Sequence, residues 1–373
     1  MKVGILTQPL HSNYGGILQN MALQTVLRRA GHEVLTLNHA APEKSWFSLL
    51  KWEVKKRFRH AAYDPGDKGK KVLFREINDF IGRNMEVSPV LRSEDAICRY
   101  AEEGGFNAFV VGSDQCWRPS YNPFIKLMFL PFCEGRKDVA RVAYAASFGT
   151  EEWEFDEKLT AECAELLHKF DGVSVREDSG VAMCQERFET EARLVLDPTM
   201  LLSREEYEAL AGEEPVGSGI MVHILDPGPD KNSAIESYSK EKGLETFSIL
   251  PRHQIETLSL KAYRSERESC LYASPEKYIR AFMDADEVVT DSYHTCVFSI
   301  IFNKDFRIIE NGRRGNARFE SLLRLFALED RIVSPGNLEK PLRDIDWAKV
   351  NSRLAELKKD SLNFLVTSLS REK

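Results

Sequence analysis

The sequence predicts an α/β protein in which two doubly wound domains, each built on a parallel sheet, face one another across a cleft. Three observations predict this class. Short β-rich runs alternate with helical patterns along most of the 373 residues, which is typical of parallel sheets covered by helices. A polar segment with Pro and Gly, residues 213–219, divides this pattern into two blocks. Polar residues follow several predicted strands, at the edge where open parallel sheets bind ligands.

The first block is expected to be an N-terminal domain of residues 1–212. A strand at 3–6 leads through Gly15 and Gly16 into a helix that ends at Gly31, and a second strand follows at 34–37. This strand–helix–strand unit is the start of a parallel sheet. The later elements are strands at 109–111, 139–145, 173–175 and 193–196, and helices around 159–170 and 181–182.

The second block is expected to be a C-terminal domain of residues 213–345, followed by a helical segment at 346–373. Ser274 is a suitable N-cap and Pro275 a suitable first residue for one of its helices. The expected strands are 220–225, 246–250, 287–290 and 306–309, and the expected helices are 231–242, 275–283, 294–302, 317–327 and 346–369.

Composition narrows the classes of function. Lys and Arg number 51 against 58 Asp and Glu, a net charge of -7, which argues against broad nucleic-acid binding because that rests on clustered positive charge. The seven Cys show no C-x-x-C spacing and the eight His no zinc-binding spacing, so we expect reduced thiols, no metal and no cofactor. The apolar start is too short for a signal peptide and no apolar stretch could span a bilayer. We therefore expect a cytoplasmic protein.

A basic insertion interrupts the first block at about 44–75. Trp46, Leu50, Val54 and Phe58 follow one another at steps of four, with Lys and Arg around them. Such a helix can rest on an anionic membrane surface, which would put the protein in peripheral contact with the inner face of the membrane. The alternative is that its apolar stripe packs on the first domain.

The first candidate binding loop precedes the first helix. Glycines here allow a ligand close to the backbone, and the free N–H groups of a helix start favour anions. A tight turn that binds no ligand fits the same residues, because the spacing matches no phosphate-binding motif. The candidate residues are Asn13, Tyr14, Gly15, Gly16, Gln19 and Asn20.

Two further loops follow buried strands. Ser113, Asp114 and Gln115 are polar side chains whose burial is unfavourable unless they are hydrogen-bonded or functional; helix capping is the alternative. Arg176 leaves the end of another strand, where its guanidinium could bind phosphate or carboxylate. A structural pair between Arg176 and the adjacent Glu177 or Asp178 is equally consistent with the sequence.

A fourth loop brings a histidine to a helix start. Asp291, Ser292 and His294 lie too close together in one turn to form a Ser-His-Asp triad, but His294 could contact a phosphate or supply a proton. Arg313, Arg314 and Arg318 follow the next strand and form either another anion clamp or a solvated basic turn.

Taken in order, these segments resemble the polysaccharide pyruvyl transferase family over roughly residues 1–330. The resemblance implies a GT-B-like pair of Rossmann-type domains, with the C-terminal helix crossing back to the first domain. It also implies transfer of pyruvate from phosphoenolpyruvate to sugar hydroxyls as a ketal, with release of phosphate, in exopolysaccharide biosynthesis. The matching segments are 13–24, 111–117, 147–149, 174–177, 196–199 and 290–295.

The resemblance also implies roles for individual residues. His294 would be the general acid or a phosphate contact, since histidine titrates near pH 6.5, and Arg176 would bind the phosphoenolpyruvate anion. Asp114 would orient or deprotonate the acceptor hydroxyl. Some relatives carry a second Arg where this chain has Ser292, and Arg313, Arg314 or Arg318 would compensate.

The partners and two alternatives follow from the same residues. Phosphoenolpyruvate would bind on the side of the second domain, and a sugar or glycan acceptor, free or lipid-linked, on the side of the first; nucleic acid is not expected. A GT-B glycosyltransferase that uses a nucleotide sugar could hold a diphosphate with the same cations. A non-catalytic glycan- or anion-binding scaffold could keep the fold without the reaction.

Overall fold

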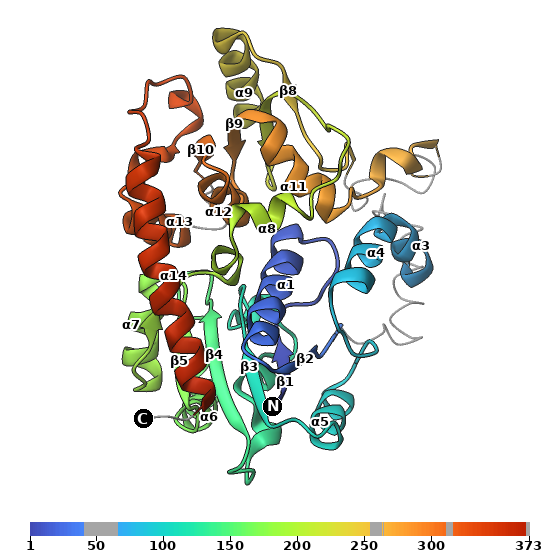
Figure 1. The fold of residues 1–373 in the computed structure, drawn as a ribbon, viewed down its shortest axis with the longest axis vertical. Coiled ribbons are helices and arrows are strands. Elements are labelled where there is room, and N and C mark those ends of the chain that lie inside the picture. Colours follow the sequence, from blue (N-terminus) through green and yellow to red (C-terminus); the bar gives the residue numbers. More distant parts are fainter. Residues whose placement is uncertain (41–65, 254–262, 264, 311–315, 371–373) are drawn as a thin grey trace.

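The computed structural model describes residues 1–40, 66–253, 263, 265–310 and 316–370, with the side chains of 66–68 left out. It contains two parallel sheets, one in each half of the chain, arranged one above the other along the long axis (Figure 1). The predicted fold class is therefore confirmed.

The first sheet has six parallel strands in the order β2-β1-β3-β4-β5-β6. Val3 of β1 pairs with Val34 of β2 on one side and with Ala108 of β3 on the other, so the N-terminal strand lies inside the sheet. The strands are β1 (Lys2–Leu6), β2 (Glu33–Thr36), β3 (Ala108–Val111), β4 (Ala140–Ala146), β5 (Gly172–Val175) and β6 (Arg193–Leu194).

Helices cover both faces of this sheet. On one face lies α1, which begins where the Asn13 side chain accepts a hydrogen bond from the N–H of Gly16; α5, α6 and α7 lie on the other. The helices in this half are α1 (Tyr14–Arg29), α3 (Gly66–Leu73), α4 (Arg75–Asn84), α5 (Glu94–Glu103), α6 (Glu157–Leu167), α7 (Asp178–Phe188) and α8 (Arg204–Glu208).

The second sheet has five parallel strands in the order β11-β10-β9-β7-β8. The Ser274 side chain caps the N-terminus of α11, as the sequence predicts. The strands are β7 (Gly219–His223), β8 (Thr246–Phe247), β9 (Ala285–Thr290), β10 (Asp305–Ile309) and β11 (Ile332–Val333), and the helices are α9 (Pro229–Lys242), α11 (Pro275–Asp284), α12 (Tyr293–Ile301), α13 (Ala317–Phe326) and α14 (Trp347–Ser370).

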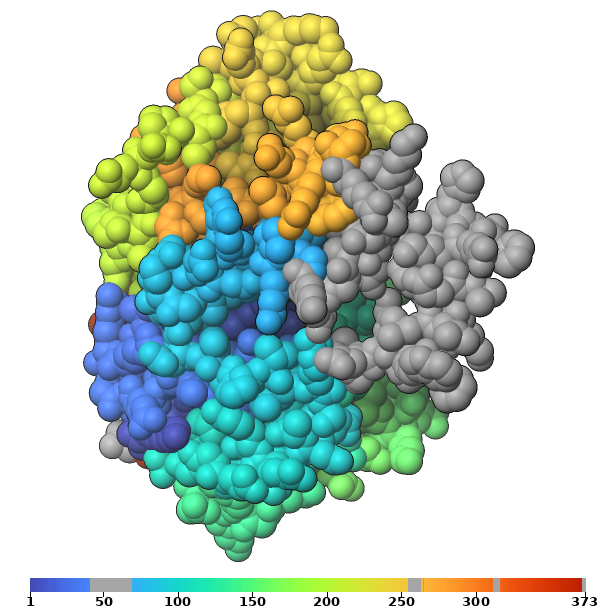
Figure 2. All heavy atoms as spheres, turned by 90° about the vertical axis from the view of Figure 1, so that its right-hand side faces the viewer, coloured from blue at the N-terminus to red at the C-terminus, as the bar shows by residue number. Residues whose placement is uncertain are grey.

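One hydrophobic core runs through both halves. It joins Ile17 of α1 and Val110 of β3 to Met221 of β7 and Phe298 of α12. In Figure 2 the light-blue atoms of α4 meet the orange atoms of α11 along the seam between the halves, where Arg83 pairs with Glu276. The contact between the two halves is thus continuous with their interiors.

The C-terminal helix α14 returns to the first half, as expected. It runs along β4 and β5 (Figure 1), and the N–H of Leu196 donates a hydrogen bond to Ser361 Oγ. A Cβ on Gly172 of β5 would lie 2.2 Å from Ser368 Oγ. The absence of a side chain at position 172 therefore allows this close approach.

Several elements differ from the sequence-based expectation. Three strands are shorter than expected: they end at His223, Phe247 and Leu194 rather than at residues 225, 250 and 196. Apolar residues in the buried or half-buried loops beyond these ends carry the same signal as strands. Helices α4 and α5 and strand β11 were not expected. The first part of the predicted basic insertion, including Trp46 to Phe58, lies outside the described residues.

The structure also bears on membrane insertion and redox state. None of the described helices combines the length and apolar character needed to cross a bilayer. All seven cysteines are free, and six of them are buried, where burial raises the pKa of the thiols of Cys116 and Cys184 to about 12. Such thiols remain protonated at neutral pH and are poor nucleophiles.

Candidate active site at the seam between the two sheets

Arg176 occupies the centre of the candidate site. It follows β5, is buried, and donates from Nη2 to Asp114 Oδ1 at 2.9 Å and from Nη1 to Asp197 Oδ2 at 2.7 Å. Its guanidinium carbon lies 4.4 Å from the ring centre of Tyr293. Two carboxylates therefore already compensate its charge.

The local ion pairs expected for Arg176 are not its main ones. Glu177 Oε2 lies 3.9 Å from Nε, beyond hydrogen-bond distance, and Asp178 pairs with Arg324 instead. The carboxylates that form hydrogen-bonded ion pairs with Arg176 are Asp114 and Asp197, which come from distant parts of the chain.

His294 reaches the same place from the other half of the protein. It lies in the first turn of α12, and its Nε2 is 3.4 Å from Arg176 Nη1 and 3.6 Å from Asp197 Oδ2. The structure thus brings Arg176 and His294 together across 118 positions of sequence. We call the group formed by Asp114, Arg176, Glu177, Asp197, His294 and Arg318 the charged cluster.

Within the described residues, Arg318 is the cation of the charged cluster that forms no ion pair with a carboxylate. It lies in α13 and is buried, and its Nε makes no hydrogen bond within the described part of the chain. Its guanidinium carbon lies 5.9 Å from the ring centre of Tyr293. Burial, and then repulsion by Arg176, lower the pKa of Arg318 to about 10, so Arg318 still carries its charge at neutral pH.

The carboxylates of the charged cluster have different electrostatics. Burial would raise the pKa of Asp197, but His294 and Arg176 hold it well below its usual range. Arg176 likewise lowers the pKa of Asp114 against the effect of burial. Burial raises the pKa of Glu177, and Arg176 offsets this only in part. Asp114 and Asp197 are therefore fixed anions, whereas Glu177 is the carboxylate easiest to protonate.

The start of α1 closes over the charged cluster. Asn13 Nδ2 donates to Asp114 Oδ2 at 2.9 Å. A Cβ on Gly15 would lie 2.0 Å from His294 Cγ and 2.1 Å from Nδ1, and one on Gly16 would lie 3.4 Å from Asp114 Oδ2. Gly15 is therefore explained by the close approach of α1 to His294, whereas a Cβ on Gly16 would first meet the Asn13 side chain, 2.9 Å from its Nδ2.

The other predicted residues of the first half support these groups. Gln19 accepts from the N–H of Ser113, and Ser113 Oγ lies 3.2 Å from Asp197 Oδ2; neither Ser113 nor Asp114 caps a helix. Gln115 Oε1 accepts from Arg118. Asn20 lies apart from the charged cluster and accepts from Thr36.

Tyr14 contributes to the seam rather than to the charged cluster. Its hydroxyl donates to the carbonyl of Ala273, and its ring stacks on Tyr278 of α11 with 5.0 Å between centres. His223, at the end of β7, meets both rings edge-on. Two rings from different halves thus form a buried contact beside the charged cluster.

Asp291 and Ser292 lie at the end of β9. Asp291 Oδ1 accepts from the N–H of Leu225, and its Oδ2 pairs with Lys231 at 2.6 Å, so this carboxylate anchors the loop after β7. Ser292 precedes α12, and its N–H donates to Thr290 Oγ1. Arg313 and Arg314 lie outside the described residues.

Sequence reasoning missed Asp197, Tyr293 and His223 as members or neighbours of this site, and it named Glu177 only as a possible ion-pair partner of Arg176. Asp197 directly follows a predicted strand and precedes a Pro, and a carboxylate at such a position is a usable signal. Tyr293 and His223 gave none, because a single ring at a strand or helix end is most often core.

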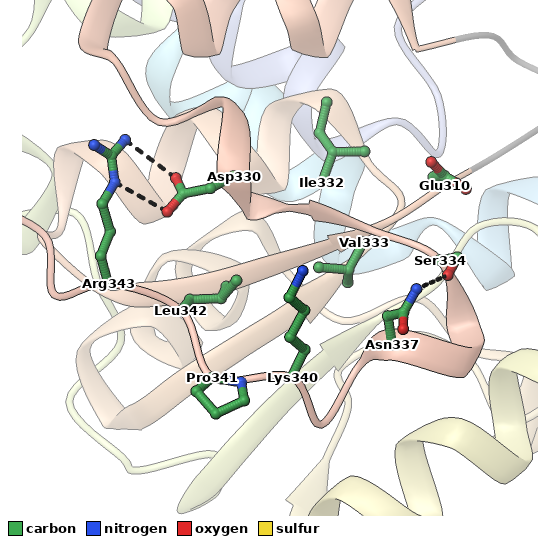
Figure 3. Close-up of a pocket in the computed structure, with 10 residues that line it drawn as sticks. All are labelled: Glu310, Asp330, Ile332, Val333, Ser334, Asn337, Lys340, Pro341, Leu342 and Arg343. Carbon is green, nitrogen blue, oxygen red and sulfur yellow. Dashed lines mark hydrogen bonds and ion pairs between the residues drawn. The ribbon is translucent and has the colours of Figure 1, made fainter.

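A separate cavity of about 400 Å³ lies at the edge of the second sheet. Figure 3 shows Lys340 extending toward Val333, with Arg343 paired to Asp330. Its lining includes no member of the charged cluster. Across the described ranges, no group of three or more His, Cys, Asp or Glu residues is arranged to hold a metal ion.

Comparison with solved structures supports the two-sheet fold. UGT89C1 of Arabidopsis thaliana, complexed with UDP-L-rhamnose, has a TM-score of 0.53 at 8% identity, with 98% of each chain covered. UDP-GlcNAc 2-epimerase of Neisseria meningitidis, bound to UDP-GlcNAc, has a TM-score of 0.52 at 8% identity over 100% of both chains. At such identities the likeness shows the GT-B fold alone.

Sequence comparison identifies the family. No curated protein gives a significant match. The family profile described as polysaccharide pyruvyl transferase matches residues 13–313, a span that begins at the N-cap of α1 and contains every member of the charged cluster except Arg318. The chain therefore belongs to the polysaccharide pyruvyl transferase family, a family of transferases.

Proposed function

We propose that this protein transfers pyruvate from phosphoenolpyruvate to hydroxyls of a sugar in a polysaccharide or glycan precursor, forming a ketal and releasing phosphate. The observation that carries this proposal is the meeting of His294 with Arg176 and Asp197 in a buried cluster that also holds Arg318, whose Nε has no hydrogen-bond partner among the described residues. A proton donor beside an available cation is the combination that an enol phosphate requires.

The chemical role of His294 follows from the electrons that move. The imidazolium gives its proton to the methylene carbon of phosphoenolpyruvate, and positive charge develops at C2. A sugar hydroxyl forms a bond to C2 and loses its proton. Phosphate then leaves with the electron pair of the C–O bond, and a second hydroxyl of the sugar closes the ketal with loss of its own proton.

Arg318 is the residue we assign to the anion of the donor. An unpaired buried guanidinium is unfavourable in the free protein, and a phosphate or carboxylate would relieve that cost. Each charge-assisted hydrogen bond contributes about 1.5–3 kcal/mol. Arg176 can add a contact through its Nε, which has no hydrogen-bond partner among the described residues, or by exchanging one of its carboxylate partners; Arg313 and Arg314 are further candidates.

Asp114 is better suited to orienting the acceptor than to deprotonating it. Its carboxylate is held by Arg176 and Asn13, and its lowered pKa makes it a weak base. We assign acceptor binding to residues 1–212, donor binding to residues 213–345, and a bracing role to the helix in 346–373.

A glycan screen tests the reaction. The protein is incubated with phosphoenolpyruvate and single sugars or lipid-linked precursors, and free phosphate and the mass of one ketal-linked pyruvate are measured. His294→Gln should abolish both signals while its melting temperature stays close to that of the wild type. Phosphate release by His294→Gln at the wild-type rate would remove His294 from the reaction.

A nucleotide-sugar transferase is the second candidate, because two proteins with the same fold bind UDP-sugars. Thermal shift separates the two candidates, since a ligand that binds the native state raises the melting temperature. Phosphoenolpyruvate should raise it and UDP-sugars should not. The reverse result would favour glycosyl transfer.

A further inference from the structure

Asp197 has no part in the reaction as proposed above, yet it is the most completely held carboxylate of the charged cluster. It is buried and lies between β6 and a short 3₁₀ turn, Pro198–Leu201. Its Oδ1 accepts from the N–H of Thr199 at 3.0 Å and from Thr199 Oγ1 at 2.7 Å. These bonds fix the plane of the carboxylate and leave Oδ2 facing the seam.

The second oxygen is shared between two cations of different kinds. Oδ2 accepts from Arg176 Nη1 at 2.7 Å and lies 3.6 Å from His294 Nε2. Nε2 is also 3.4 Å from Arg176 Nη1. An unprotonated Nε2 could accept from Arg176, whereas a protonated Nε2 can interact favourably only with Asp197, because two donors repel.

The charge balance of the charged cluster decides between these arrangements. Arg176 with Asp114 and Asp197 sums to one negative charge, and Arg318 with Glu177 sums to zero. With Glu177 ionised, a protonated His294 brings the buried group to neutrality, which a low-dielectric interior favours; with Glu177 protonated, the cluster is already neutral and the ion pair with Asp197 alone favours the charged imidazole.

The other groups that face Asp197 leave this balance unchanged. Tyr144 of β4, Tyr207 of α8 and Tyr293 of α12 are buried, and burial raises the pKa of each phenol above its ordinary value. All three therefore remain uncharged at neutral pH.

We propose that Asp197 is a positioning residue that keeps His294 protonated and fixes its ring against α1, ready to give a proton to the substrate. This inference rests on the proposed function for its purpose, but not for its test, because protonation of His294 can be observed without turnover. Thr199 would act one step further away, by holding the carboxylate that holds the imidazole.

NMR titration of the histidine ring C–H signals provides the test. The His294 signal is assigned as the one that disappears in His294→Gln, and the pH at which it is half shifted is compared among variants. Asp197→Asn removes the charge and keeps the shape. Asp114→Asn is the comparison variant, since Asp114 acts on His294 through its charge alone and, within the described residues, forms its hydrogen bonds with Arg176 and Asn13. Thr199→Val is a milder change should Asp197→Asn fail to fold.

The expected midpoint for His294 in Asp197→Asn lies about one pH unit or more below that of the wild type, because an adjacent opposite charge shifts titration by that order. Thr199→Val should shift it in the same direction by less, and Asp114→Asn by less than Asp197→Asn. An unchanged midpoint in both Asp197→Asn and Thr199→Val, or a larger shift in Asp114→Asn, overturns the inference.

Activity then separates this inference from the proposed function. If phosphate release is found, the alkaline fall of kcat should move to lower pH in Asp197→Asn. If no glycan supports phosphate release but the NMR midpoints shift as expected, the proposed reaction fails while the control of His294 by Asp197 stands. If phosphate release is found but the NMR midpoints do not shift, the proposed reaction stands and the control of His294 by Asp197 fails.

Discussion

The burial of His223 predicts a specific loss of stability in mild acid. His223 ends β7 at the seam between the halves, and its Nδ1 has no hydrogen-bond partner within the described part of the chain. Burial lowers its pKa from 6.5 to about 4, and Asp291 opposes this only in part. The native protein therefore holds this imidazole neutral at pH values where an unfolded chain would protonate it.

The magnitude follows from the difference in proton uptake. Above pH 6.5 neither state binds the proton, so His223 adds no pH dependence. Between pH 6.5 and 4 only the unfolded state takes it up, and the free energy of unfolding falls by about 1.4 kcal/mol per unit. Below pH 4 the native state is protonated as well and the loss levels off. The total is about 3 kcal/mol.

Urea unfolding at half-unit steps from pH 7.5 to 4 measures this effect. His223→Phe keeps an aromatic ring against Tyr14 and Tyr278 and removes the titration, so its curve of unfolding free energy against pH should be flatter than the wild-type curve by about 3 kcal/mol in total. His168→Gln, which removes an exposed histidine, should run parallel to the wild type. Carboxylates contribute equally to all three proteins. Parallel curves for His223→Phe and the wild type would refute the reasoning.

Three other substitutions have defined outcomes. Gly15→Ala places a Cβ 2.0 Å from His294 Cγ and should lower kcat about a hundredfold by displacing the ring. Gly82→Ala is the control, because its Cβ meets no described atom within 4 Å, and it should leave kcat unchanged. Equal effects of the two substitutions on kcat would contradict the close-approach argument. Arg318→Gln should raise KM for phosphoenolpyruvate about ten- to a hundredfold in steady-state kinetics without lowering the melting temperature, and an unchanged KM would exclude Arg318 from donor binding. Phe364→Ala should lower the free energy of unfolding by about 3–5 kcal/mol in urea, and a loss under about 1 kcal/mol would show that α14 adds little to the first half.

Much of the fold follows from patterns within a few residues of each other. The strand at 108–111 and the capped helix after Ser274 are set by local apolar periodicity and capping, so the sequence predicts them well. β11 has only two residues, too few for a periodic signal. α4 does carry a helical apolar pattern in Ile77, Phe80 and Ile81, which is a usable signal that the prediction missed. The strand end at His223 was misjudged because Ile224 beyond it is also buried, and the end at Phe247 because Ile249 and Leu250 beyond it are apolar and half-buried.

The sequence predicted several residues of the candidate site, but not the ion pairs and hydrogen bonds that join them. That Arg176 and His294 follow strands made their convergence a reasonable expectation. Their electrostatic state depends on Asp114 and Asp197, which pair with Arg176 from 62 and 21 positions away. No local pattern shows that these partners already compensate the charge of Arg176, and so the sequence could not show that Arg318 forms no ion pair within the described residues.

The last helix has a mechanical consequence. At 24 residues and about 1.5 Å per residue, α14 is a stiff rod of roughly 36 Å whose end portion is fastened to β4 and β5. α14 also packs on α13 of the second half, so if that half swings away to admit a sugar, the rod must either separate from α13 or bend at a joint near its beginning at Trp347. A proline introduced in the first turn of α14 would change the flexibility of the chain near Trp347 and leave the part of α14 that packs on β4 and β5 intact.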